Sequence, residues 1–120
     1  MDTPITDQRM FLVTYHSADT VVLAVHGEVD LDSAQPLRLA LDEAARYGAG
    51  PVVVDLSGVL FADTTIVNTL LRARSGLGER LRLAAPSWPV LRLLRILGMG
   101  NVFAIHTGRA AALRDGPVHV

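Results

Sequence analysis

The stretch VVVDLSGVLFADTT, residues 52–65, decides the fold. It opens with an apolar run, Pro51–Leu56, which predicts a short strand buried on both faces of a parallel sheet. The Ser-Gly pair at 57–58 predicts a turn after that strand. Asp63 and Thr64 then stand where a capping residue and the first helical residue are expected. A buried strand followed by a helix is the repeating unit of an α/β sheet.

The residues before this stretch predict a hairpin and a helix. Runs of apolar and Thr/Tyr residues favour strands over 10–15 and 20–26, with a turn at 17–19 between them. Ser33 is the expected N-cap of the helix, Pro36 is tolerated in its first turn, and the Gly-rich segment 48–51 ends it.

The residues after it repeat the strand-helix unit. The helix that begins near Asp63 is expected to end at Gly76 and Gly78, and Ser87 is the expected cap of the next helix. Strands are expected over 81–84 and 102–105, and a last helix from a Thr107 cap through Leu113.

This order of elements predicts an α/β fold built on a mostly parallel sheet. We expect about five strands, with one antiparallel N-terminal edge strand, and about four helices. The length of 120 residues fits a single domain over residues 1–120. Its ordered core is expected at about 9–114, with residues 1–8 loose and 115–120 forming a tail.

Composition excludes several classes of function. The chain has 11 basic and 12 acidic side chains and a net charge of -1, so no basic field is present for nucleic acid. No cysteine and no lysine occur, which excludes thiolate metal sites, a cysteine nucleophile and Schiff-base chemistry. His16, His26, His106 and His119 lack metal-ligand spacing. We therefore expect no catalytic residues, no metal and no cofactor, and a protein that is not an enzyme.

The apolar segments are short. None approaches the roughly 18 uninterrupted apolar residues of a membrane-spanning helix, so direct membrane insertion is not expected. The first residues carry an early acid and lack the pattern of a signal peptide. Together with the absence of cysteine, these features predict a cytoplasmic, bacterial-type protein, and they also fit a peripheral protein on the cytoplasmic side of a membrane.

Polar residues follow two of the predicted strands. If those strands are parallel neighbours, Asp30 and Asp63 share one rim of the sheet. Thr64 and Thr65 lie beside them at a helix N-terminus, where the macrodipole and free N–H groups favour anions. A phosphate on Thr64 would add about -1.5 to -2 charges there without melting the helix. The alternative is that Asp63 or Thr64 simply caps the helix.

Three segments carry a family resemblance. VHGEVDLDSAQPL (25–37) resembles a Gly-Glu-hydrophobic-Asp segment followed by a helix start, and VVVDLSGVLFADTT (52–65) resembles a strand, Asp-Leu-Ser/Thr and Phe-x-Asp-Ser-Ser-Gly. LRLAAPSWPVLRLLRILGMGNVFAIHTGRAAAL (81–113) resembles the closing strand, helix, Gly turn and strand-helix. Together they are similar to a STAS domain of the anti-sigma factor antagonist family, over nearly the whole chain.

The resemblance implies a partner-switching cycle and a site for it. Thr64 matches the phosphoacceptor, with Thr65 as second choice, and Asp30, Asp63, Thr64, Thr65 and Ile66 match the partner-binding surface. The unphosphorylated form would bind an anti-sigma factor serine/threonine kinase and release the sigma factor. Phosphorylation of Thr64 would end that binding, and a metal-dependent serine/threonine phosphatase would reset the switch.

Two positions depart from the family pattern. Thr64 replaces the usual Ser, and its β-branch restricts the rotamer that a kinase uses. Ile66 replaces the usual Gly, and it either packs inward or changes the surface that faces a partner. A second interpretation is therefore a STAS subunit of an ABC-type phospholipid transport complex. Such a subunit binds the ATPase subunit without needing phosphorylation.

Overall fold

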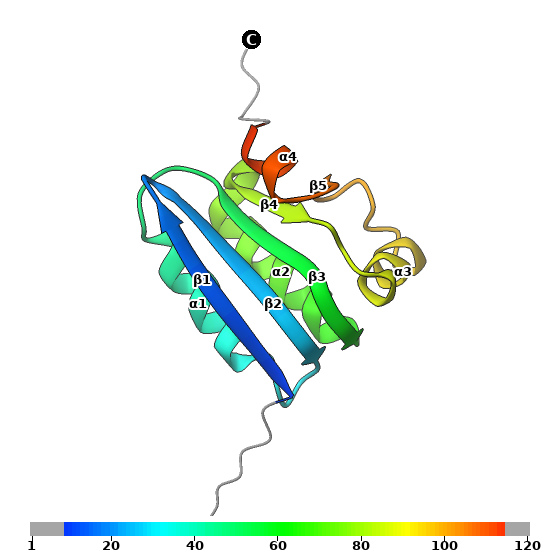
Figure 1. Cartoon of the computed structure of the whole chain (residues 1–120). Coiled ribbons are helices and arrows are strands. Elements are labelled where there is room, and N and C mark those ends of the chain that lie inside the picture. The colour runs from blue at the N-terminus through cyan, green and yellow to red at the C-terminus, as the bar shows by residue number, and fades with distance from the viewer. Residues whose placement is uncertain (1–8, 115–120) are drawn as a thin grey trace, which may run out of the picture.

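Five strands lie side by side in chain order and form a single sheet (Figure 1). The computed structural model describes residues 9–114, so the expectations for 1–8, 115–120 and His119 lie outside the described residues. The strands are β1 (Met10–Ser17), β2 (Thr20–Val29), β3 (Val52–Ala62), β4 (Leu81–Ala84) and β5 (Ala104–His106). The helices are α1 (Gln35–Ala45), α2 (Thr64–Leu77), α3 (Trp88–Ile96) and α4 (Arg109–Arg114), with a 3₁₀ turn at Gly78–Arg80.

The strand directions match the expected α/β architecture. β1 runs antiparallel to β2, and every later neighbour is parallel. The predicted fold class, with one antiparallel N-terminal edge strand and four helices, is confirmed. Within residues 9–114, no helix combines the length and apolar character needed to cross a membrane.

The two faces of the sheet are covered unequally. Helices α1 and α2 pack on one face, and their buried side chains join those of α3 in the main core (Figure 1). This core includes Leu37, Ile66, Leu70 and Leu94, all fully buried. The opposite face carries a small cluster under α4, formed by Val22, Val53, Ala84 and Ala112. A rigid apolar core on one side therefore fixes the loops at the strand ends.

β3 is longer than the sequence predicts. The expected turn at Ser57 and Gly58 is wrong, because pairing with β2 continues through two register shifts to Ala62. The Asp55 carboxylate accepts hydrogen bonds from the N–H (3.0 Å) and hydroxyl (2.8 Å) of Ser57. A Cβ on Gly58 would lie 2.3 Å from Nδ1 of His26. Glycine at this position therefore leaves room for the His26 ring and does not form a turn.

Other element ends also differ. Ala34, not Ser33, is the N-cap of α1, because the Ser33 hydroxyl bonds the Glu28 carbonyl (2.7 Å) instead. Ser87 is the N-cap of α3, as predicted, but its side chain makes no capping bond. Gly76 lies inside α2, and Gly78 alone caps its end. The last strand is 104–106 rather than 102–105, and the last helix begins at 109.

Candidate functional site

The candidate site lies at the edge where β2 and β3 end. Val29 pairs with Ala62 in the parallel ladder, and the N–H of Asp63 donates a 3.2 Å hydrogen bond to the Val29 carbonyl. The loops that carry Asp30 and Asp63 therefore lie side by side (Figure 1). The predicted sharing of one rim by these two acids is confirmed.

Asp63 caps α2. Its backbone is extended, and its carboxylate accepts a 2.9 Å hydrogen bond from the N–H of Thr65. Thr64 is the first residue of the helix and is exposed. Within residues 9–114, the Thr64 hydroxyl has no hydrogen-bond partner. The capping interpretation is thus confirmed for Asp63, and it leaves the Thr64 hydroxyl available to a partner.

Asp30 is held by its own chain. Its carboxylate accepts two hydrogen bonds from Arg9, at 2.6 and 3.1 Å, and others from the N–H groups of Asp32 and Ser33. The hydrogen bond from Arg9 is the main cause that holds the pKa of Asp30 below its ordinary value, while partial burial opposes it. The carboxylate stays ionised and shapes the loop. Sequence reasoning missed Arg9, because only the pairing of β1 with β2 brings it to this loop.

Ile66 corrects one expectation about the partner surface. Its side chain is fully buried in the main core. It therefore packs inward, and this side chain does not contact a partner. Thr65, by contrast, is partly buried at the surface, and its carbonyl accepts a 2.7 Å hydrogen bond from the Thr69 hydroxyl.

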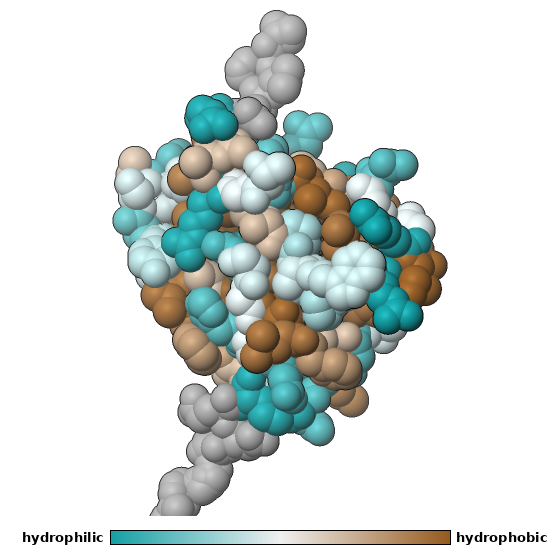
Figure 2. Space-filling view, turned by 45° about the vertical axis from the view of Figure 1, so that its right-hand side comes forward, coloured by the Kyte–Doolittle hydropathy of each residue, from teal (hydrophilic) through white to brown (hydrophobic). Residues whose placement is uncertain are grey.

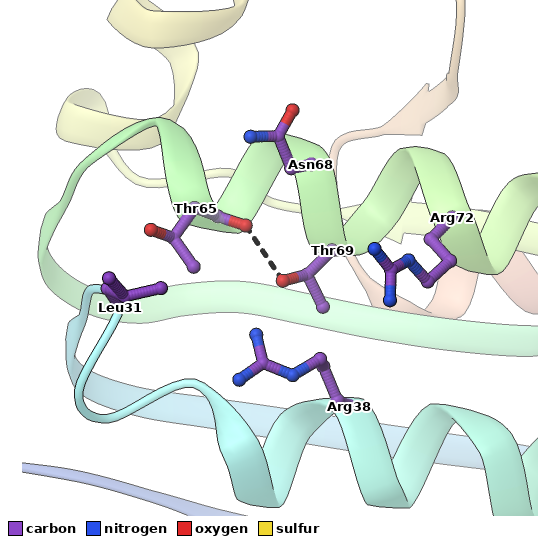
Figure 3. A pocket seen from close by; sticks show the side chains of 6 residues that line it. All are labelled: Leu31, Arg38, Thr65, Asn68, Thr69 and Arg72. Carbon is purple, nitrogen blue, oxygen red and sulfur yellow. Dashed lines mark hydrogen bonds between the residues drawn. The ribbon is translucent and has the colours of Figure 1, made fainter.

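A polar groove runs between α1 and α2 next to Thr65. Its volume is about 210 Å³. Figure 3 shows Arg38 reaching into it from α1, and Arg72 from α2. The remaining lining residues are Leu31, Thr65, Asn68 and Thr69. This groove could not be predicted from the sequence, because its two arginines come together only when α1 packs against α2.

Apolar side chains surround the same rim. Leu60 and Phe61 at the end of β3 are 76% and 52% exposed, and Leu31 after β2 is 71% exposed. Figure 2 shows hydrophobic surface at the level of the β3 end. Trp88, at the start of α3, is 63% exposed, with the Arg95 guanidinium 5.9 Å from its ring centroid. Exposed apolar groups beside a polar centre are typical of a protein-docking surface.

The acid of the Asp-Leu-Ser segment has a different role. Asp55 is nearly buried, and Arg109 of α4 donates a hydrogen bond to its carboxylate. Burial alone would raise the pKa of Asp55, but the hydrogen bonds from Ser57 and Arg109 hold it below its ordinary value. The Arg109 guanidinium also lies 5.0 Å from the ring centroid of Tyr15. This cluster fastens α4 to the sheet. Among residues 9–114, no three His, Asp or Glu side chains are placed to share a metal ion.

The fold resembles several solved structures of low sequence identity. An anti-sigma factor antagonist from Mycobacterium paratuberculosis is 21% identical, with a TM-score of 0.79 over 92% of this chain and 100% of its own. A STAS-domain protein from Planctomyces limnophilus is 17% identical, with a TM-score of 0.74 over 86% and 95%. The Bacillus cell fate determinant SpoIIAA in its phosphorylated form is 17% identical, with a TM-score of 0.67 over 87% and 97%.

Sequence comparison gives the family. No curated protein matches the chain. The family model described as "Mlab, STAS domain" matches residues 13–107, which is most of the chain. The structures above share the overall fold of this chain. The chain therefore belongs to the STAS-domain family, and its structural neighbours are anti-sigma factor antagonists.

Proposed function

We propose that this STAS domain is an anti-sigma factor antagonist. In its unphosphorylated form it binds an anti-sigma factor serine/threonine kinase and so releases the sigma factor. Phosphorylation of Thr64 ends that binding. The observation that carries the proposal is the exposed Thr64 at the start of α2, whose hydroxyl has no hydrogen-bond partner among the described residues and which lies near exposed apolar side chains.

The docking surface of this proposal consists of Leu31, Leu60, Phe61, Asp63, Thr64 and Thr65. Leu60 and Phe61 supply apolar contact area, and Thr64 begins the helix that follows them. Asp30 would not contact the partner directly. Its hydrogen bonds hold the loop that carries Leu31. The partner thus meets a preformed surface, and binding needs little reordering of the chain.

Phosphorylation would act by charge rather than by refolding. The Asp63 cap already holds the first turn of α2, and a helix N-terminus tolerates an anion. The phosphate would move the net charge from -1 to roughly -3, with the change concentrated on the docking surface. A partner that buries Leu60 and Phe61 would then have to desolvate a dianion. A metal-dependent phosphatase would remove the phosphate and restore binding. The domain itself would catalyse nothing and would work in the bacterial cytoplasm, in transcription control.

The test is a binding comparison with the cognate kinase. Wild type and Thr64→Ala are expected to bind it, and Thr64→Glu is expected to bind much more weakly. Thr107→Glu is the matched control, because it adds the same charge at an exposed threonine outside the docking surface. Intact mass after incubation with the kinase and ATP should show one phosphate fewer on Thr64→Ala than on wild type. Equal binding by all four proteins would refute the switch.

A second function uses the same surface. Thr64 in place of Ser favours a STAS subunit of an ABC-type phospholipid transport complex that binds its ATPase subunit. An apolar docking surface would serve such a complex without phosphorylation. Binding to an ATPase subunit that is unchanged by Thr64→Ala, with no phosphorylation by a kinase, would select this function.

A further inference from the structure

We propose that the groove between α1 and α2 is a phosphate-binding site and that its occupant is a phosphate carried by Thr65. This deepens the regulation in the proposed function, and it rests on that function only for the kinase that supplies the phosphate. Two adjacent hydroxyls would then give two different phosphorylated states of one domain.

The groove is positively charged. Arg38 and Arg72 enter it from opposite helices, and Figure 3 shows both guanidinium groups reaching toward Thr69. Arg38 donates to the neutral side-chain oxygen of Gln35, at 3.2 and 3.3 Å. Within residues 9–114, neither arginine forms an ion pair with a carboxylate. The groove, of about 210 Å³, therefore holds two positive charges that form no ion pair within the described residues.

The two threonines are placed differently with respect to the groove. Thr65 lines the groove, whereas Thr64 is exposed and does not line it. Both residues follow the Asp63 cap and belong to the first turn of α2, so the helix N-terminus favours a phosphate on either one. Of the two, only Thr65 lines the groove together with two arginine side chains. A guanidinium group can donate two parallel hydrogen bonds to two oxygens of one phosphate.

Carboxylates near the groove would repel a phosphate. The Asp63 carboxylate lies beside both threonines, since it bonds the N–H of Thr65. Asp42 faces a continuation of the groove farther along α1, together with Arg38 and Arg72. Asp30 is already bonded to Arg9. A phosphate on Thr65 therefore meets two arginines against one adjacent carboxylate, whereas a phosphate on Thr64 meets the carboxylate without them.

The modification is a simple phosphoryl transfer. The Oγ1 atom of Thr65 forms a bond to the γ-phosphorus of ATP, the bond to ADP breaks, and the hydroxyl proton leaves to the kinase's base. The resulting phosphate would bridge Arg38 and Arg72 and tie α1 to α2. Its charge would be neutralised inside the chain, whereas a phosphate on Thr64 would stay exposed to a partner.

The experiment needs no partner protein. Phosphothreonine is installed at position 65 or at position 64 during synthesis of the full chain, and each phosphate is titrated by phosphorus NMR. Opposite charges nearby favour the dianion, so the second pKa of the phosphate at position 65 should be lower by about 0.5 to 1 pH unit than that at position 64. The double variant Arg38→Gln with Arg72→Gln should abolish this difference. Arg74→Gln is the matched control on α2, since Arg74 does not line the groove.

Two results would overturn the inference. One is an equal second pKa at both positions in the wild-type background. The other is binding of inorganic phosphate to the unmodified chain, lost in the double variant, without any pKa difference between the phosphothreonines. That result would assign the groove to free phosphate instead of Thr65. Each single arginine variant is titrated too, so that a double variant that fails to fold does not decide the outcome. Failure here leaves the Thr64 switch intact, because that switch is tested by kinase binding.

Discussion

The guanidinium of Arg9 donates two hydrogen bonds to the carboxylate of Asp30, at 2.6 and 3.1 Å. The residue just before β1 thus fastens the loop that follows β2, and this loop borders the docking surface. The acid that the family resemblance assigns to partner contact has its main bonds within the chain. Asp30 is a positioning residue for the loop.

Arg9→Gln should make the chain less stable at neutral pH but not at acid pH. The pKa of Asp30 lies below its ordinary value of 3.8 in the folded chain, mainly because of the hydrogen bond from Arg9. The ionised pair therefore contributes stability above about pH 4, and this contribution is lost as the pH falls through the folded pKa. Thermal melts of wild type and variant should differ at pH 7, approach each other below the ordinary pKa and converge only below the folded pKa. Arg46→Gln, on the exposed side after α1, is the control, and melts that differ equally at all pH values would contradict the role of Asp30.

Gly27→Ala and Gly76→Ala should change stability in opposite directions. Gly27 has φ +95°, and a Cβ there would lie 2.0 Å from the carbonyl oxygen of Arg9, so the alanine is both strained and obstructed by backbone. We expect a loss of about 1–3 kcal/mol or more in the free energy of unfolding. Gly76 lies inside α2 with open space around it, so alanine should add about 0.5–1 kcal/mol through helix propensity. Urea unfolding measures both changes. If Gly27→Ala leaves the free energy of unfolding unchanged, the Arg9 carbonyl does not lie this close to Gly27.

Asp63→Ala and Asp63→Asn separate capping from charge. Alanine removes the acceptor of the Thr65 N–H and should cost about 1 kcal/mol, whereas asparagine is itself a good N-cap and should cost much less. Both variants remove the carboxylate charge from the docking surface. If kinase binding depends on that charge, both should weaken it equally; if binding depends on the order of the first turn of α2, only alanine should. Equal stability of the two variants would contradict the capping role.

The main elements could be predicted from sequence, because local patterns decide them. The apolar run after Pro51 and the Asp63 cap are read from neighbouring residues alone. The extension of β3 through Gly58 could not be predicted, since it depends on the ring of His26 in the neighbouring strand. Ser33 met the local rule for a cap, but the Glu28 carbonyl takes its hydroxyl. Contacts that the local sequence pattern does not show decided these cases.

At the candidate site too, only part of the arrangement could be predicted from the sequence. Asp30 and Asp63 were predicted at one rim because parallel strands end at the same edge. Ile66 was placed on the partner surface by matching to the family pattern, but the first turn of α2 directs it into the core. The groove of Arg38 and Arg72 exists only through the packing of α1 against α2. Topology can be read from one sequence, whereas side-chain direction needs the packed structure.

Leu60→Asp should weaken partner binding without unfolding the domain. Leu60 is 76% exposed at the end of β3, so its side chain contributes little to the core. A partner that buries it would have to desolvate the new carboxylate next to Asp63, and we expect at least a tenfold loss of affinity for the kinase. Leu39→Asp is the matched control, because Leu39 is 57% exposed on α1 and lies outside the docking surface. Isothermal titration calorimetry measures both affinities, and thermal melts check that both variants stay folded. If Leu39→Asp weakens binding and Leu60→Asp does not, the partner docks on α1 instead of on the surface around Thr64.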